Sequence, residues 1–223
     1  MNLEMVAFDV AGTVLNDDGL VINAFKKAFE ASQPELWPIH GVEWTQYALD
    51  TMGQSKIHVF TTLLGDSEQA YKANAAFEEA YMNEIAETGA TPIPGAKDVI
   101  SFLKEIGVKV ALTTGFSRTT LDSIITELGW GDLIDASITP SEAGRGRPEP
   151  DMLIKVAEML GISSPQNVIV VGDTAADMQA AIAFGAGKAI GVLTGAHKEE
   201  QLREAGATSV VNSVFDLKSL ISC

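Results

Sequence analysis

Asp9 stands near the end of the apolar run MVAFDV, and Gly12 and Thr13 follow it closely. A carboxylate held at the end of a buried strand can act as a nucleophile or bind a metal ion. A second carboxylate two residues after Asp9 would be an obvious proton donor, but that position is Ala11. We therefore expect a chemistry at Asp9 that does without an acid at this place.

Two more carboxylates occur together in the segment GDTAADM. Asp173 follows an apolar strand pattern, and Asp177 comes four residues later, in the first turn of a predicted helix. This spacing lets both side chains face one point, and with Asp9 they offer the hard oxygen ligands that suit Mg²⁺. Each residue also has an ordinary alternative role, since Asp173 could form a turn and Asp177 could compensate the helix dipole. The metal prediction therefore depends on the three residues together.

Candidate phosphate-binding groups occur in two other segments. GRPEPD contains Arg147, whose guanidinium can clamp phosphoryl oxygens through paired donors. TTGFSR contains Thr114, a hydroxyl donor, and Gly115, which lets backbone amides approach an anion closely. The sequence does not distinguish Thr113 from Thr114 as the residue that contacts a phosphoryl group. Each segment also has an ordinary interpretation. Arg147 could be a solvated loop arginine, and TTGFSR could be a plain strand-to-helix turn in which a hydroxyl caps the helix.

Short, strand-like apolar runs alternate with helical patterns along most of the chain. The predicted strands cover 5–10, 108–114, 136–139, 168–173, 189–195 and 209–213. Helical stretches such as 96–107 and 151–161 separate them, each closed by glycine. Continuous apolar runs suit strands covered on both faces. The alternation predicts an α/β fold with a doubly wound parallel sheet.

The predicted sheet would bring the polar residues together. Ligands bind beyond the carboxyl ends of the strands in such a sheet. Asp9, Thr114 and Asp173 each follow a predicted strand, and Arg147 lies in the loop after the third one. Their convergence at one edge is stronger evidence for a site than any single motif.

One long segment interrupts the strand–helix alternation. From about 21 to 90 the sequence has helical patterns, including the stretch 70–89, and TPIPGA resembles a return linker. We therefore predict a helical cap domain at 15–92, inserted into an α/β core domain formed by 1–14 and 93–223. No internal repeat or low-complexity tract is present.

Composition excludes several classes of partner. The net charge of −15 argues against nucleic acid, whose phosphates would be repelled, although a few local cations could still bind a small anion. The single cysteine, Cys223, cannot form a disulfide within the chain. The N-terminus lacks the pattern of a signal peptide, and no apolar stretch approaches membrane-spanning length, so we expect a cytoplasmic protein without a membrane partner. His40 and His197 lack partners at informative spacing, and we expect loop or surface positions for both.

Taken together, the motifs resemble the haloacid dehalogenase superfamily over essentially the whole chain. Its four motifs appear in order as DVAGT, TTG, RPEP and GDTAADM, with Arg147 where many members have lysine. The resemblance implies that Asp9 attacks phosphorus and forms an aspartyl phosphate, while Thr114 and Arg147 hold the phosphoryl group. It also implies an Mg²⁺ site made by Asp9, the Ala11 carbonyl, Asp173 and Asp177.

Ala11 makes the resemblance more specific. Ordinary phosphatases of this superfamily carry an aspartate there, because an alkoxide leaves poorly without a proton. The form D-x-A-G-T is similar to that of the phosphonoacetaldehyde hydrolases, or phosphonatases, in which a cap lysine forms a Schiff base with the substrate aldehyde. The predicted cap contains MGQSKI, and Lys56 falls at the Schiff-base position. A nucleophilic lysine must be partly neutral, and Arg147 could supply the cation that lowers its pKa.

The resemblance thus implies an Mg²⁺-dependent hydrolase that cleaves the carbon–phosphorus bond of a small phosphonate aldehyde. Candidate substrate-binding residues are Gly12, Thr13, Gly53, Gly115 and Phe116. A homodimer is possible by analogy with phosphonatases, which pair through their caps.

Several features keep alternatives open. Phosphonatases generally have tyrosine where this chain has Phe116. They also have a cysteine early in the cap and a histidine shortly after the lysine, and this chain has neither residue at the corresponding position. Lys56 could be a surface lysine, and Gly53 could belong to a specificity loop of the kind that phosphatase caps also carry. The alternatives are therefore a phosphatase for a small phosphomonoester, and a catalytically inactive phosphate-binding or regulatory protein. The retained set of Asp9, Thr114, Arg147 and the two later aspartates argues against the inactive protein.

Overall fold

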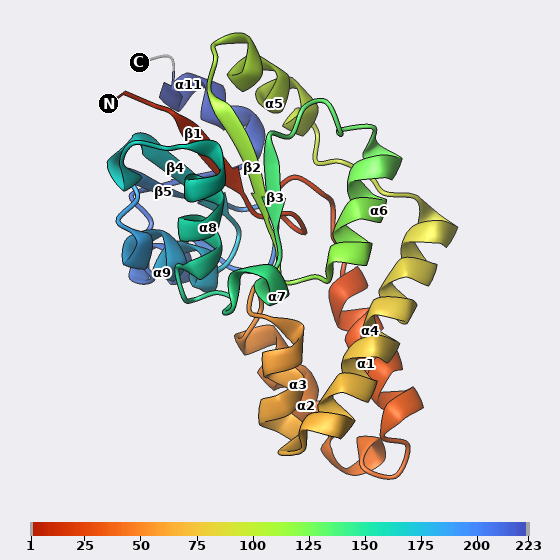
Figure 1. The fold of residues 1–223 in the computed structure, drawn as a ribbon. Helices are drawn as coiled ribbons and strands as arrows, with labels where there is room; N and C mark the ends of the chain where they lie inside the picture. The colour runs from red at the N-terminus through yellow and green to blue at the C-terminus, as the bar shows by residue number, and fades with distance from the viewer. Residues whose placement is uncertain (1, 222–223) are drawn as a thin grey trace.

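A parallel sheet of six strands forms the centre of the computed structural model, which describes residues 2–221 (Figure 1). The strands are β1 (Met5–Phe8), β2 (Lys109–Thr113), β3 (Ala136–Ile138), β4 (Val168–Gly172), β5 (Lys188–Val192) and β6 (Ser209–Val211). Their order across the sheet is β3-β2-β1-β4-β5-β6, and every pairing is parallel. The predicted α/β fold with a doubly wound parallel sheet is therefore confirmed. Cys223, for which no disulfide within the chain was expected, lies outside the described residues.

Helices cover the sheet and join its strands. They are α5 (Ala96–Glu105), α6 (Arg118–Leu128), α7 (Pro140–Ala143), α8 (Asp151–Leu160), α9 (Ala175–Phe184), α10 (Glu199–Glu204) and α11 (Leu217–Ile221), with 3-10 turns at Pro165–Asn167 and Val214–Asp216. Two apolar clusters lie against the sheet, one containing Val6 and Phe8 and the other Met5 and Ala7. Successive residues of β1 thus point into opposite clusters, which explains why its whole sequence is apolar.

β1 occupies the position where the direction of strand order reverses. Phe8 is in register with Leu112 of β2 and with Val171 of β4. The residues that follow these strands therefore leave the sheet at the same edge. A ligand site is expected there, at the topological switch point of the sheet.

The remaining four helices lie in one group beside this edge (Figure 1). They are α1 (Leu20–Ser32), α2 (Trp37–Asp50), α3 (Lys56–Leu64) and α4 (Ser67–Thr88). We call this group the cap. α4 packs against α1 and α3, and α1 packs against α2. None of the described helices is both long and apolar enough to cross a membrane.

An aromatic cluster fills the interior of the cap. The Phe60 ring lies 5.2 Å from the ring centroids of both Phe25 and Phe29, and 6.2 Å from that of Phe77. Phe29 also contacts Trp44, with 4.4 Å between centroids. Aromatic contacts of this kind add to the free energy gained by burying the rings. The cap thus has apolar packing of its own around Phe60.

Two short segments connect the cap to the sheet. The backbone N–H of Asn16 donates to the Thr91 carbonyl at 2.8 Å, and the N–H of Ile93 donates to the Val14 carbonyl at 2.9 Å. The outgoing and returning chains therefore pair as a narrow antiparallel ribbon, with Leu15 opposite Pro92. This ribbon lies beside the predicted boundaries at 14/15 and 92/93. The division into two domains at these positions stays a prediction.

Phe60→Ala is expected to destabilise the protein by about 3–5 kcal/mol, because it removes a fully buried ring from the centre of the cap cluster. Urea unfolding followed by tryptophan fluorescence measures the change. Tyr71→Ala is the matched control, since Tyr71 is an aromatic residue of α4 that is 67% exposed, and a change within about 0.5 kcal/mol is expected. Equal losses in the two variants would contradict a cap held together around Phe60.

Candidate functional site

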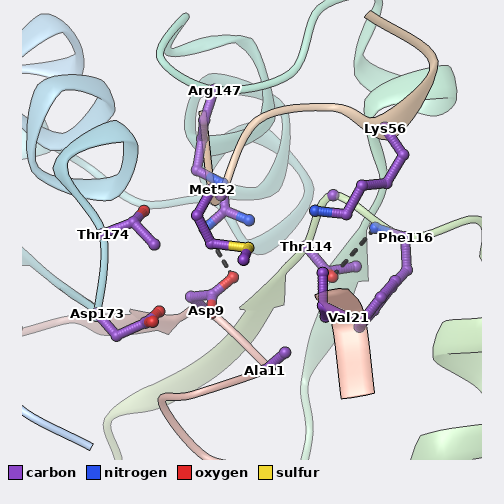
Figure 2. A pocket seen from close by; sticks show the side chains of 12 residues that line it. Asp9, Ala11, Val21, Met52, Lys56, Thr114, Phe116, Arg147, Asp173 and Thr174 are labelled. Carbon is purple, nitrogen blue, oxygen red and sulfur yellow. Dashed lines mark hydrogen bonds and ion pairs between the residues drawn. The ribbon is translucent and has the colours of Figure 1, made fainter. Parts of the chain in front are cut away.

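Polar residues from three strand ends meet at the switch point of the sheet. Asp9 follows β1, Thr114 follows β2 and Asp173 follows β4, and all three side chains are buried. Figure 2 shows them around one cavity. The Asp9 N–H donates to the Val171 carbonyl at 2.9 Å, which continues the β1–β4 pairing up to the carboxylate itself. The predicted convergence of these residues is therefore present in the structure.

Arg147 reaches this cavity from the loop after α7. Its side chain is buried, with 5% of the residue exposed. One terminal nitrogen, Nη1, lies 2.7 Å from Asp9 Oδ1 and also contacts Asp177 Oδ1. The Nε atom is buried and has no hydrogen-bond partner among the described residues. The alternative of a solvated loop arginine is therefore wrong.

Asp177 has two contacts at the same time. It accepts a hydrogen bond from the backbone N–H of Thr174 at 3.1 Å, which closes a capping box at the start of α9. Its other carboxylate oxygen faces Arg147. The Asp177 side chain thus caps α9 and also belongs to the polar cluster. Its predicted roles at the helix N-terminus and in a metal site therefore do not exclude each other.

Asp173 is held by the loops around it. Its Oδ2 accepts the Ala196 N–H at 2.7 Å, and its Oδ1 accepts the Thr13 hydroxyl at 3.3 Å. Gly12 packs against the same carboxylate with a φ of +84°, where a Cβ atom would lie 2.6 Å from Oδ2. Gly12 and Thr13 do not appear among the described residues that line the cavity. The structure therefore places these two predicted substrate-binding residues behind Asp173.

The three aspartates offer a suitable ligand set for a divalent cation. Carboxylate oxygens of Asp9, Asp173 and Asp177 lie within 4.8 Å of one another, and all three residues are buried. Burial, and then repulsion from the Asp9 carboxylate, raises the pKa of Asp173 above its usual range. A hard dication would relieve this repulsion, and oxygen donors are the ligands that Mg²⁺ prefers. The residues present therefore fit the predicted magnesium site.

Lys56 enters the cavity from the cap. It is the first residue of α3 and is 8% exposed, so the alternative of a surface lysine is wrong. Figure 2 shows its terminal nitrogen pointing into the cavity. The nitrogen lies 5.8 Å from the centre of the Phe77 ring and has no hydrogen bond or ion pair within residues 2–221. Burial, and then the charge of Arg147, lowers the pKa of the Lys56 amine.

The cavity is small and closed by the cap. Its lining consists of Asp9, Ala11, Val21, Met52, Gly53, Lys56, Thr114, Gly115, Phe116, Arg147, Asp173 and Thr174. Its volume of about 30 Å³ accommodates water but not a molecule of substrate size.

The cap loop that follows α2 is pressed against the core. A Cβ atom at Gly115 would lie 2.7 Å from the Gln54 carbonyl oxygen, and one at Gly53 would collide with the Thr174 side chain. Glycine at these two positions therefore permits the closed arrangement. Both glycines line the cavity, as does Phe116. Thr114 lines it too, whereas Thr113 is absent from the described lining.

The loop after β5 is part of the site, although no residue in it was predicted. The Thr194 hydroxyl donates to the Gly12 carbonyl at 2.7 Å, and Ala196 donates to Asp173 as described above. His197 is 9% exposed, and its Nδ1 accepts the Ala175 N–H at 2.8 Å. His197 therefore lies in a loop, as expected, but it is buried there and not at the surface. The signal that could have found this loop is its place at the carboxyl end of a parallel strand.

Comparison with known proteins agrees with this geometry. The family profile of the haloacid dehalogenase-like hydrolases matches residues 3–185. A phosphonoacetaldehyde hydrolase from Bacillus cereus is 32% identical over 199 residues, which cover 80% of this chain and 72% of that protein. A bifunctional riboflavin kinase/FMN phosphatase from Arabidopsis thaliana is 28% identical over 216 residues, or 96% of this chain and 54% of that protein.

A solved structure supports the fold independently. A phosphonoacetaldehyde hydrolase like protein from Oleispira antarctica superposes with a TM-score of 0.84 at 24% identity, covering 100% of this chain and 92% of that one. The match of the family profile over most of the chain, together with the aspartates and arginine gathered at the switch point, shows that the protein belongs to the haloacid dehalogenase-like hydrolases.

Proposed function

We propose that this hydrolase cleaves the carbon–phosphorus bond of a small phosphonate aldehyde, such as phosphonoacetaldehyde or a close relative. The observation that carries the proposal is the Lys56 amine, which is buried without a hydrogen-bond partner in the described structure and shares its cavity with Asp9. Similarity to the phosphonoacetaldehyde hydrolase of Bacillus cereus supports the same chemistry.

The proposed reaction begins at Lys56. The neutral amine attacks the aldehyde carbon, the oxygen of the resulting carbinolamine takes up a proton from solvent and leaves as water, and a protonated imine forms. Because burial and Arg147 lower the pKa of Lys56, a larger fraction of the amine is neutral than for an exposed lysine. The iminium then serves as an electron sink for the bond that must break.

Asp9 performs the second covalent step. A carboxylate oxygen attacks phosphorus, the carbon–phosphorus bond breaks, and its electron pair moves into the iminium to give an enamine. The products of this step are an aspartyl phosphate on Asp9 and an enamine on Lys56, and water later hydrolyses both. The departing carbon needs no proton at the moment of cleavage, which is why Ala11 can replace an acid.

In the proposed reaction, Arg147 and Thr114 hold the phosphoryl group. The Thr114 hydroxyl oxygen accepts the Phe116 N–H at 3.2 Å, which leaves its own proton free for donation to a phosphoryl oxygen. Arg147 has an unpartnered Nε and a charge already placed beside Asp9. When bound, Mg²⁺ would be held by Asp9, the Ala11 carbonyl, Asp173 and Asp177, and would neutralise charge on the phosphoryl oxygens.

The second candidate is a phosphatase for a small phosphomonoester. Similarity to the riboflavin kinase/FMN phosphatase over 96% of this chain favours it. In this reaction water or a cap residue would have to replace the missing acid at Ala11. The cap domain at 15–92, the cytoplasmic location and a homodimer stay predictions alongside either function.

Incubation with phosphonoacetaldehyde and borohydride is expected to leave a reduced adduct on Lys56, identified by peptide mass spectrometry. Lys56→Ala should lose the adduct and slow turnover by about 10²–10⁴-fold, because it removes a positioned catalytic group. Lys26→Ala is the control, since Lys26 is an exposed lysine of the cap, and it should behave as wild type. Unchanged turnover in Lys56→Ala would exclude the imine.

The pH dependence of trapping tests the state of the Lys56 amine. Because burial and Arg147 lower its pKa, the amine becomes neutral, and therefore reactive, at a lower pH than ordinary lysine with a pKa of about 10.4. We expect trapping with a small neutral aldehyde and cyanoborohydride to rise with pH and to reach its midpoint below that value. A lysine in an unstructured peptide is the reference. A midpoint equal to or above the reference would contradict the lowered pKa.

Ala11→Asp separates the two candidate functions. An acid at this position would protonate a departing alkoxide, so the variant is expected to hydrolyse alkyl phosphates about 10²-fold faster than wild type. The same substitution should increase the rate of p-nitrophenyl phosphate hydrolysis much less, because the p-nitrophenolate leaving group needs little protonation. If the wild-type enzyme already cleaves alkyl phosphates as fast as the variant, the phosphatase candidate replaces the carbon–phosphorus hydrolase.

A further inference from the structure

The loop after β5 bridges the core and the cap. Its Thr194 and Ala196 contact Gly12 and Asp173, as described above, and these contacts lie entirely within the core. His197, the next residue, also binds the core, because its backbone N–H donates to the Asp173 carbonyl at 3.2 Å and its Nδ1 accepts the Ala175 N–H at 2.8 Å. Its imidazole is therefore fixed against the first residue of α9.

The other side of the same ring faces the cap. Leu49, in the last turn of α2, and Asp50 line the same cleft as His197. With Nδ1 used as an acceptor, the remaining ring nitrogen carries the proton and can donate to a backbone carbonyl of the cap. The imidazole thus lies between the start of α9 and the end of α2.

This bridge spans a place where cap and core are otherwise separated. A cleft of about 470 Å³ opens between them, with Asp17, Gln46 and Leu49 on the cap side and Thr194, Ala196 and His197 on the core side. The chain leaves α2 directly after this contact and continues into Met52 and Gly53, which line the catalytic cavity. Holding the end of α2 therefore also holds the loop that closes the cavity.

We infer that His197 is a positioning residue that stabilises the closed cap: its Nδ1 is bound to the core at Ala175, and its other ring nitrogen donates to the Leu49 carbonyl across the cleft that both residues line. It does not touch the reacting atoms. Its effect is on the fraction of molecules in which Lys56 and Asp9 share one closed cavity. The inference holds for whichever substrate the closed cavity accepts.

Two substitutions separate the two halves of the bridge. In His197→Asn the side-chain oxygen can replace Nδ1 and accept the Ala175 N–H, but the shorter side chain does not reach Leu49. In His197→Gln the amide nitrogen can replace the distal ring nitrogen and donate to Leu49, while the contact with Ala175 is lost. Loss of closure in His197→Asn, with partial rescue in His197→Gln, would distinguish cap positioning from simple support of the core.

Closure is measured without substrate through the chemical protection of Lys56. Acetic anhydride labels exposed amines, and peptide mass spectrometry gives the labelling rate of Lys56, which is buried when the cap is closed. We expect Lys56 to be labelled about two- to tenfold faster in His197→Ala and His197→Asn, the effect of losing one hydrogen bond from the closed state. In activity assays the same variants should show a raised KM with a smaller change in kcat.

The control is His40→Ala, which removes a histidine from the cap surface, where it lies 3.7 Å from Glu43. Lys56 labelling in this variant should match wild type. If His197→Ala folds and Lys56 remains as protected as in wild type, the inference is wrong. If His197→Ala does not fold, His197→Asn decides, and unchanged protection in it would equally exclude a role in closure. Because labelling uses no substrate, these results stand apart from any failure to trap an imine.

Discussion

The buried Arg147 side chain sets the electrostatic conditions of the whole site. It lies against Asp9 and Asp177, and Asp173 is part of the same cluster of carboxylates. With all three carboxylates ionised, the cluster and one guanidinium would carry an excess of two negative charges in a buried place, which is costly without compensation and is consistent with the raised pKa of Asp173. A divalent cation would balance this excess, so the charge balance and the oxygen ligand set both favour Mg²⁺. The same guanidinium lowers the pKa of Lys56 across the cavity, so one residue connects the carboxylate cluster of the core to the amine of the cap.

The sequence allowed much of this arrangement to be predicted, because strand ends in a parallel sheet have a common direction. Asp9, Thr114 and Asp173 follow short apolar runs that are recognisable without a structure, and they do meet at one edge. Helix ends were also predictable where glycine closes the helix, as at Gly161 after α8. The strand pattern at 189–195 was correct in its place but too long, since β5 ends at Val192. The last residues of that pattern instead form the loop that binds Gly12 and Asp173.

What the sequence did not show are contacts made across long separations. Glu78 of α4 accepts the Ser117 N–H at 3.1 Å and the Ser117 hydroxyl at 2.9 Å, and it also accepts the Thr120 hydroxyl. It thereby places a cap carboxylate at the start of α6, next to the loop that carries Thr114. Nothing about a glutamate within a charged helical stretch indicates such a contact. His197 was missed for the same reason, because its partners are defined only when α2, α9 and the loop after β5 are brought together.

The division of the reacting groups between cap and core gives these contacts their importance. Asp9 directly follows strand β1 of the sheet, whereas Lys56 belongs to the first turn of a cap helix. The proposed reaction places an imine on Lys56 and a phosphoryl group on Asp9, so it proceeds only while the cap is closed. The closed cavity, however, is too small to admit substrate. Closure must therefore be favourable but reversible. A few polar contacts of moderate strength suit this requirement better than a large apolar interface, because they can break and re-form with each turnover. The absence of an acid at Ala11 fits the same division, since in the proposed reaction the electron sink that replaces this acid would be the Lys56 imine of the cap.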